Sequence, residues 1–394
     1  MDGIKPAGPD HRIPALLEAD LPAVAATSLR RSVTDLAEVQ AESITPPGAN
    51  MTTGGLWRIT GTARAHAGDG RPGDQPFSVV VKLTQSPLLW SGIDVVPPDL
   101  REQLGLRYPW RTEAQAYASG LAAALPDVAW MPDAYLITEI DPQRTLIWMA
   151  DAAGAAANWS DAAYADAAYA LGRISGSPEV AACVAQVADA TTILRLRFYL
   201  EGVGSQLLIP MIQGNDIWQH PAVTGAADEA VITGLRRLAD DCWDLMDGLV
   251  ALPQLPVHGD ASPQNLMLRR PAANGSRTGF AVVDWGNFGR GPAGFDLAQL
   301  LAGRVNSGDL SGDQLHRLAP LCGEAYCEGM SDAGAEPVPS EVRHGMVAAL
   351  ALFSGLGVLP FDRLGGPPTP GLDDLVAGRL EMARFILGAL DAGW

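Results

Sequence analysis

The stretch VHGDASPQNLM at residues 257–267, with FAVVDW following at 280–285, carries the pattern that decides how this chain is interpreted. Asp260 precedes Asn265 by five residues, and Asp284 closes the apolar run. This layout suits phosphoryl transfer from a metal-bound nucleotide. One carboxylate orients the acceptor hydroxyl, while an amide and a second carboxylate hold magnesium over the phosphates. The pattern therefore predicts a kinase.

The length and composition of the chain fit two lobes that each bury a core. It has 394 residues, which is longer than one typical domain. Of these residues, 47% are hydrophobic. No run of about 18 uncharged apolar residues appears, so we expect no membrane span. The start, MDGIKPAGPDHRIP, lacks the basic and apolar regions of a secretory signal. We therefore expect a cytoplasmic protein.

The formal net charge of −18 limits the choice of binding partner. It argues against nucleic acid, whose phosphates require basic surfaces. It would favour a cationic substrate through electrostatic steering, but the same charge is equally consistent with a role in solubility alone. The charge leaves both interpretations open.

Lysine usage is more informative than net charge. The chain has 25 arginines but only two lysines, Lys5 and Lys82, and Lys82 lies inside the β-branched run FSVVVKL. A charge within a central strand needs a partner, because unpaired burial is costly. A compact, flexible ammonium group suits phosphate binding. The alternative is a lysine on an edge strand that points to solvent; we favour the phosphate-binding interpretation.

Alternating and β-branched patterns in the first part of the chain predict five strands. An amphipathic helix is predicted between the third and fourth strands, at 107–125, and it carries Glu113 near its start. We expect Glu113 to pair with Lys82, although a first-turn acidic residue also complements the helix dipole. The five strands are expected at residues 33–44, 56–67, 77–85, 133–140 and 145–152.

The segment TPPGANMTTGG at 45–55 reads as a turn between the first two strands. It matches neither G-x-G-x-x-G nor the Walker sequence. Gly48 and Gly54, with the hydroxyls of Thr52 and Thr53, could donate hydrogen bonds to phosphate. An ordinary hairpin turn is the alternative for each of these residues.

Helical patterns dominate from about residue 159 onward, and MADAAGAAA at 149–157 looks like a hinge between two lobes. In a kinase, Met149 and Ala150 would present backbone N–H and C=O groups to adenine. A plain core position is the commoner fate of a residue such as Met149.

The HGD sequence at 258–260, with its asparagine five residues on and the aspartate–tryptophan pair at 284–285, resembles the aminoglycoside phosphotransferase and choline kinase-like families. These are relatives of the protein kinases, and the resemblance covers about residues 33–305. It implies a bilobal, protein kinase-like α+β fold. Residues 1–150 would form a nucleotide-binding N-lobe with a five-stranded antiparallel sheet, and 151–394 a mainly helical C-lobe with the catalytic loop and the substrate cleft.

The resemblance also implies roles for individual residues. Asp260 would be the catalytic base, and Asn265 and Asp284 would bind Mg²⁺, while Lys82 and Glu113 would act at the phosphates of ATP. His258 is expected to brace the loop rather than react. Asp296 is expected to belong to the scaffold. The resemblance implies that it starts a helix and braces the catalytic loop, while the residues alone suggest the N-cap of a helix.

The acceptor is the part of the function that the sequence leaves open. The family name suggests a hydroxyl of an aminoglycoside-like antibiotic or amino sugar, which would make the chain an antibiotic resistance enzyme. A metabolic kinase of choline or another small alcohol is the first alternative. A catalytically silent nucleotide-binding regulatory protein is the second, but the intact Lys82, Asp260, Asn265 and Asp284 argue against it.

Overall fold

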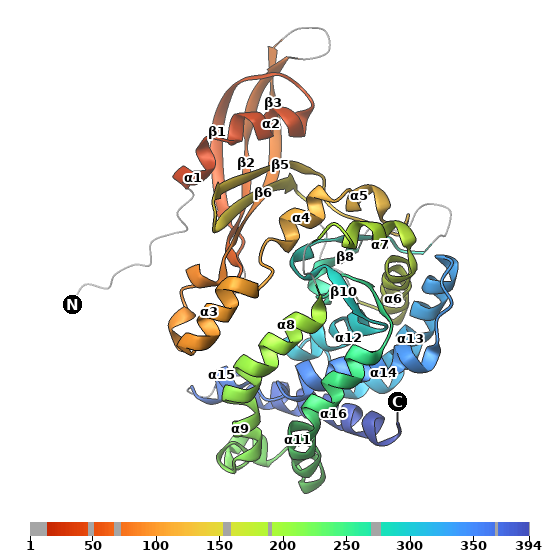
Figure 1. The fold of residues 1–394 in the computed structure, drawn as a ribbon. Helices are drawn as coiled ribbons and strands as arrows, with labels where there is room; N and C mark the ends of the chain where they lie inside the picture. Colours follow the sequence, from red (N-terminus) through yellow and green to blue (C-terminus); the bar gives the residue numbers. More distant parts are fainter. Residues whose placement is uncertain are drawn as a thin grey trace, which may run out of the picture. The chain divides into compact units, whose positions relative to one another are not determined.

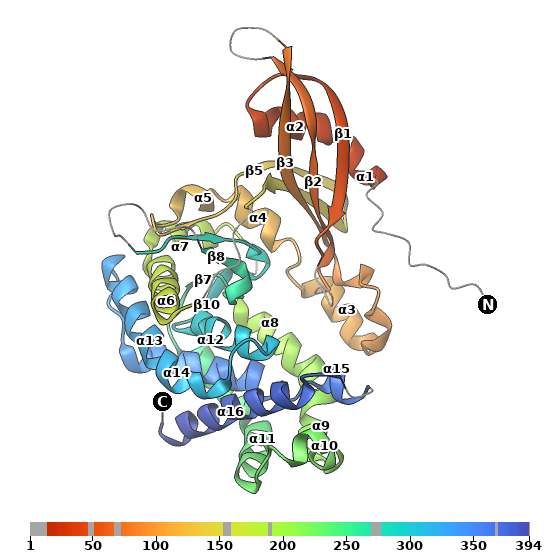
Figure 2. The same cartoon turned by 180° about the vertical axis from the view of Figure 1, so that it is seen from behind.

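The computed structural model divides the chain into two compact units (Figures 1 and 2). Unit 1 comprises residues 1–117 and 132–153, and unit 2 comprises 118–131 and 154–394. Each unit is described by itself. The described residues are 14–45, 51–66, 72–152, 159–187, 191–268, 277–366 and 369–393.

Unit 1 is built on a five-stranded sheet in the order β1-β2-β3-β6-β5. Every neighbouring pair of strands is antiparallel, so the predicted antiparallel sheet is confirmed. The strand that carries Lys82 lies at the centre, as expected. The strands are β1 Val33–Ser43, β2 Thr53–His66, β3 Pro72–Gln85, β5 Ala134–Asp141 and β6 Arg144–Ala150.

The two faces of this sheet have different roles because side chains alternate along a strand. Along β3, Val79, Val81 and Leu83 lie in the hydrophobic core of the unit. Helices α1 (Ala15–Glu18) and α2 (Leu21–Leu29) supply the other side of that core, and α2 crosses the sheet in Figure 1. The intervening residues of β3, including Lys82, therefore point to the opposite face.

The single helix predicted at 107–125 is wrong, because the segment forms two helices. They are α4 (Thr112–Ala118) and α5 (Leu121–Ala124), and Gly120 between them has a φ of +81°. Glycine adopts this left-handed conformation readily, and it interrupts the helix. A further helix, α3 (Pro98–Arg107), precedes them and was not predicted.

Unit 2 is mainly helical, as predicted. Among its described residues, as among those of unit 1, no helix has both the length and the apolar character needed to cross a membrane. The helices are α5 Leu121–Ala124, α6 Asp161–Gly176, α7 Pro178–Val184, α8 Thr192–Tyr199, α9 Ile209–Gln213, α10 Pro221–Thr224, α11 Glu229–Ala251, α12 Phe295–Ser307, α13 Leu315–Asp332, α14 Pro339–Leu350, α15 Phe361–Leu364 and α16 Leu372–Asp391.

Close helix packing forms the frame of unit 2. Helices α6 and α13 run side by side in both views (Figures 1 and 2). A Cβ atom on Gly172 would lie 2.1 Å from the carbonyl oxygen of Tyr326, and one on Gly329 would lie 2.2 Å from that of Tyr169. Glycine at both positions therefore lets the two backbones approach directly.

Two small sheets position the loops of unit 2. β7 (Gln254–Val257) pairs with β10 (Gly289–Pro292), and β9 (Phe280–Val282) lies between β8 (Leu266–Leu268) and β4 (Ala129–Trp130). β8 and β9 were predicted, whereas β4, β7 and β10 were not. The three missed strands have two to four residues each, too few for an alternating pattern to be visible.

Truncation of the core of unit 1 tests which face of the sheet is buried. Ile59 on β2 is fully buried in the cluster beneath α2, whereas its neighbour Thr60 is exposed. Ile59→Ala should lower the free energy of unfolding by about 2–5 kcal/mol. Thr60→Ala should change it by no more than about 0.5 kcal/mol. Urea unfolding of both variants measures the difference, and equal effects would contradict the assigned core.

Candidate active site

The HGD loop begins where β7 ends, at Val257. Gly259 has a φ of +85°, and a Cβ atom there would lie 2.2 Å from the carbonyl oxygen of Asn287. Only glycine suits both the left-handed backbone and the close approach. The loop therefore turns sharply just before Asp260 and packs against the segment that follows Asp284.

His258 holds the loop from inside, which confirms its predicted bracing role. Its Nε2 lies 2.9 Å from the carbonyl oxygen of Val283, and its Nδ1 accepts a hydrogen bond from the backbone N–H of Asp260 at 3.3 Å. Both contacts are satisfied by a neutral imidazole with its proton on Nε2. The ring is fully buried and meets Trp285 edge to face at 4.7 Å. His258 thus links the two ends of the motif.

Asp296 holds the same loop from the opposite side. Its two carboxylate oxygens accept the backbone N–H groups of His258 and Gly259, each at 2.8 Å. These bonds confirm the predicted bracing of the loop, whereas the N-cap of α12 is Gly294, so the N-cap role is wrong. Asp296 is the second residue of the helix, and its carboxylate is directed to the loop. Burial raises the pKa of Asp296 to about 7, against the lowering effect of the two N–H donors.

Asn265 lies at the end of a short 3-10 turn, Pro263–Asn265. Its Nδ2 donates to the backbone carbonyl of Asp260 at 2.9 Å. The amide is therefore oriented by the loop, and its Oδ1 is the end that can accept a cation. Asn265 is 7% exposed, so the side chain has little freedom to turn. Asp260 and Asn265 are thus placed side by side by the backbone.

Asp284 follows β9 at a distance of two residues, so the strand ends earlier than the predicted apolar run. Its backbone is left-handed, with φ 60° and ψ 61°. A non-glycine residue in this region costs roughly 1–2 kcal/mol, less for aspartate than for most. A 3-10 turn, Trp285–Asn287, begins immediately after it. Trp285 is fully buried and donates from Nε1 to the carbonyl oxygen of Val282 at 3.0 Å.

The oxygen donors of Asn265 and Asp284 fit a magnesium–nucleotide complex. Mg²⁺ is usually held by one or two protein carboxylates or amides, with phosphate oxygens and water completing its shell. Within the described ranges, no group of three or more His, Cys, Asp or Glu side chains could hold a metal by itself. A carboxylate and an amide oxygen are donor types that a magnesium–nucleotide complex takes from a protein.

Unit 1 contains the predicted ion pair. Lys82 Nζ on β3 lies 2.6 Å from Glu113 Oε2 on α4, and the two side chains are 8% and 3% exposed. Lys82 pairs with Leu56 on β2 and Ile147 on β6, which excludes an edge strand. The interpretation of Glu113 as a simple first-turn acid is therefore insufficient.

The predicted phosphate loop is only partly described. Gly48 lies outside the described residues. Thr53 and Gly54 belong to β2 rather than to a loop, because Thr53 pairs with Thr84 on β3. A register irregularity falls at Gly54, where a Cβ atom would lie 2.6 Å from Gln85 Oε1. The carbonyl of Thr52, which directly precedes the strand, accepts the backbone N–H of Gln85 at 2.9 Å.

Met149 and Ala150, predicted to contact adenine, form the end of β6. Met149 is 6% exposed, and its Sδ accepts a hydrogen bond from Tyr117 on α4 at 3.3 Å. The N–H of Ala150 donates to the carbonyl of Asp133 at 2.9 Å, so this N–H already has a partner within the protein. The hinge segment continues into residues 153–158, which lie outside the described residues.

Arg195 on α8 is a site residue that sequence reasoning missed. It is 8% exposed, and it donates to the carbonyl oxygens of Gly286 and Asn287 at 3.1 and 3.2 Å. The sequence signal that could have identified Arg195 is its helical spacing, because Thr192 and Phe198, three residues to either side, lie on the same helix face and are also buried. An arginine on the buried face of a helix requires acceptors within the protein.

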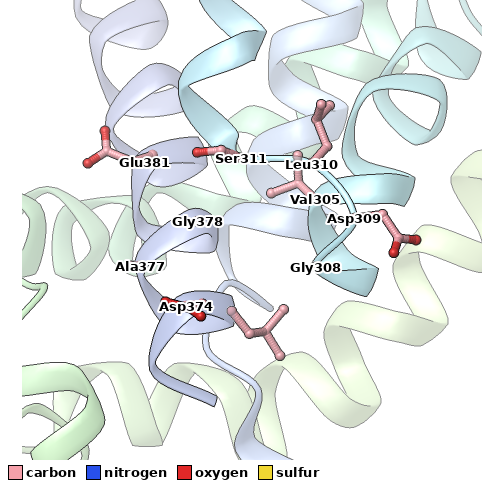
Figure 3. A pocket seen from close by; sticks show the side chains of 10 residues that line it. Val305, Gly308, Asp309, Leu310, Ser311, Asp374, Ala377, Gly378 and Glu381 are labelled. Carbon is pink, nitrogen blue, oxygen red and sulfur yellow. The ribbon is translucent and has the colours of Figure 1, made fainter. Parts of the chain in front are cut away.

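One cavity of unit 2 lies away from this machinery. It has a volume of about 340 Å³ and lies between the end of α12 and the first half of α16 (Figure 3). Three carboxylates line it: Asp309, Asp374 and Glu381. Ser307 donates to Asp309 and Arg384 to Glu381, so two of the three are bound within the protein. None of the predicted site residues lines this cavity.

Comparison with known proteins supports the class of enzyme. Residues 150–330 match the model of the phosphotransferase enzyme family, which confirms the predicted resemblance and the prediction of a phosphotransferase. No curated protein matches the chain.

Three of the similar solved structures illustrate the range of relatives. An aminoglycoside phosphotransferase from Alicyclobacillus acidocaldarius is 13% identical, with a TM-score of 0.49 over 91% of this chain and 92% of that one. An amicoumacin kinase solved with AMP-PNP and Ca²⁺ is 12% identical, with a TM-score of 0.46 over 95% and 93%. An ethanolamine kinase from Plasmodium vivax is 9% identical, with a TM-score of 0.40 over 87% and 82%.

The buried ion pair of unit 1 can be tested by a double-mutant cycle. Lys82→Met leaves the Glu113 carboxylate buried without its partner and should destabilise the protein by about 3–5 kcal/mol. Adding Glu113→Leu should recover much of that loss, because no unpaired charge remains. Urea unfolding of the two single variants and the double variant gives the coupling energy. Additive effects would show that the two groups do not interact.

The raised pKa of Asp296 predicts a pH dependence of stability. Its folded pKa of about 7 exceeds the unfolded value of 3.8. The folded state therefore holds this proton more tightly, and its contribution to stability falls as the pH rises from about 4 to 7. Between pH 5 and 7.5 the loss should be about 2–3 kcal/mol.

Asp296→Asn provides the control because it removes the titrating group. The unfolding free energy of the wild type should therefore fall by about 2–3 kcal/mol relative to that of Asp296→Asn as the pH rises through this window. Parallel profiles between pH 5 and 7.5 would show that Asp296 ionises normally.

Proposed function

We propose that the chain transfers the γ-phosphate of ATP to a hydroxyl of an amine-bearing small molecule, such as an aminoglycoside-like antibiotic or an amino sugar. The observation that supports this most strongly is the assembly around the HGD loop. Asp260 and Asn265 are held together by a backbone-to-amide hydrogen bond, and His258 connects them to the turn that carries Asp284. These are the residue types that phosphoryl transfer needs, in one unit.

In this proposal each unit has its own task. Unit 1 binds the nucleotide, with Lys82 placed by Glu113 to neutralise phosphate oxygens. Unit 2 carries the chemistry, with Asp260 accepting or orienting the proton of the acceptor hydroxyl. Asn265 and Asp284 hold Mg²⁺, which neutralises phosphate charge when it is bound. Positioning and charge neutralisation account for the rate.

The proposed acceptor carries positive charge. The chain has a net charge of −18, and a protein of this charge attracts cations. An aminoglycoside or amino sugar has both the ammonium groups that respond to this field and the hydroxyl groups that react. Choline and other small alcohols are the comparison compounds.

The acceptor class is tested with a panel of compounds. Formation of ADP from ATP and Mg²⁺ is measured with aminoglycosides, other antibiotics, amino sugars, choline and an uncharged polyol. The proposal expects acceptor-dependent turnover with one or more aminoglycosides or amino sugars. Turnover with choline alone would favour the metabolic kinase. Nucleotide binding without turnover on any acceptor would favour the regulatory alternative.

The role of Asp260 is tested by substitution. Asp260→Ala should lower kcat by about 10²–10⁴-fold, because it removes the group that orients and accepts the hydroxyl proton. ATP binding, followed by calorimetry, should stay close to wild type. Glu336→Ala, which removes an exposed carboxylate elsewhere in unit 2, is the matched control and should keep full activity. Full activity of Asp260→Ala would refute the assignment.

A further inference from the structure

We infer that Arg195 is a positioning residue that fixes the turn after Asp284 and thereby sets the affinity of the site for its metal–nucleotide complex. The inference rests on the proposed function. We do not assign Arg195 a contact with substrate or metal. It acts through the backbone that follows Asp284, the proposed metal ligand. The evidence is its hydrogen bonding, its burial and the packing of its two acceptors.

Arg195 donates to two consecutive carbonyls. Nη2 donates to Gly286 and Nη1 to Asn287, at 3.1 and 3.2 Å. These residues complete the turn Trp285–Asn287 that begins directly after Asp284. A guanidinium group offers several N–H donors in one rigid plane, so it can bind two neighbouring carbonyls at once. A lysine ammonium group is a single point charge, so it would hold the two carbonyl groups less firmly.

The same turn also contacts the HGD loop. The carbonyl oxygen of Asn287 lies where a side chain on Gly259 would be, 2.2 Å from a Cβ atom built there. Arg195 therefore holds a carbonyl that is in contact with the residue preceding Asp260. Any shift of the turn would disturb the Asp284 carboxylate and the HGD loop together.

Helix α8 is itself anchored beside this turn, which gives Arg195 a fixed base. Thr192 donates from Oγ1 to the carbonyl of Arg290 at 3.3 Å, and Thr191 forms a parallel β-bridge with the same residue. The left-handed backbone of Asp284 adds a need for support, because aspartate adopts it only where the surroundings hold it. Arg195 supplies that support from a helix that is distant in sequence.

The test measures metal binding directly as well as activity. Mn²⁺ is titrated into the protein–ADP complex, and free Mn²⁺ is followed by electron paramagnetic resonance. Arg195→Met, which keeps the length and apolar stem, should weaken Mn²⁺ binding by roughly 10- to 100-fold, as is typical for residues that orient metal ligands. Arg195→Lys should fall between this variant and the wild type. The KM for Mg²⁺ should rise in the same order.

Arg197→Met is the matched control, because Arg197 lies on the same helix and is exposed. It should leave Mn²⁺ affinity unchanged. Metal-free ADP binding should be the same in all variants, since a general loss of structure would lower it too. If Arg195→Met does not fold, the graded effect of Arg195→Lys decides the matter.

The outcomes distinguish failure of the Arg195 role from failure of the proposed function. Wild-type Mn²⁺ affinity in both Arg195 variants would overturn the positioning role and leave the proposed function intact. Loss of ADP binding in parallel with Mn²⁺ binding would assign Arg195 to general stability and also overturn it. Absence of metal-dependent nucleotide binding by the wild type would instead refute the proposed function, and this inference with it.

Discussion

The pair of hydrogen bonds from the backbone of His258 and Gly259 to the Asp296 carboxylate is the contact on which the HGD loop depends. It ties a loop with little regular structure to the start of a long helix, α12. The loop could not make these bonds to itself, since two successive N–H groups pointing the same way need an acceptor from elsewhere. A carboxylate with one oxygen for each N–H group meets that requirement. The fully buried position of Asp296 excludes water from competing.

Side chains with no proposed catalytic role join the HGD loop to the segment that carries Asp284. His258 reaches Val283 and packs on Trp285, so the loop and the strand that precedes Asp284 share one buried cluster. Asn265 returns a hydrogen bond to Asp260. The groups proposed to react are therefore oriented by backbone carbonyls and N–H groups rather than by one another. Such a site can keep its geometry while the identity of the acceptor changes.

Much of this arrangement could be predicted from the sequence, because the relevant signals are local. The five strands are visible as alternating or β-branched runs, and a lone lysine within one of these runs implies a partner, which the structure provides in Glu113. Spacing also placed Asp260, Asn265 and His258 in one loop. Features that depend on distant contacts could not be read in the same way. The left-handed backbone of Asp284 is held by tertiary packing, and short strands such as β7 and β10 exist only as a pair.

Arg195 shows why the residues that support the site could not be predicted from the sequence. In the sequence it is one of 25 arginines, and its helix resembles any other amphipathic segment. Its structural role depends on two backbone carbonyls that lie about ninety residues further along the chain. A backbone carbonyl has no sequence signature, so a side chain that binds one cannot be paired with it by pattern. Motifs therefore reveal the groups that react, whereas the groups that hold them in place are found only once the chain is folded. The residues that bind the acceptor belong to the second kind, so the sequence names candidates for phosphoryl transfer but none for acceptor binding.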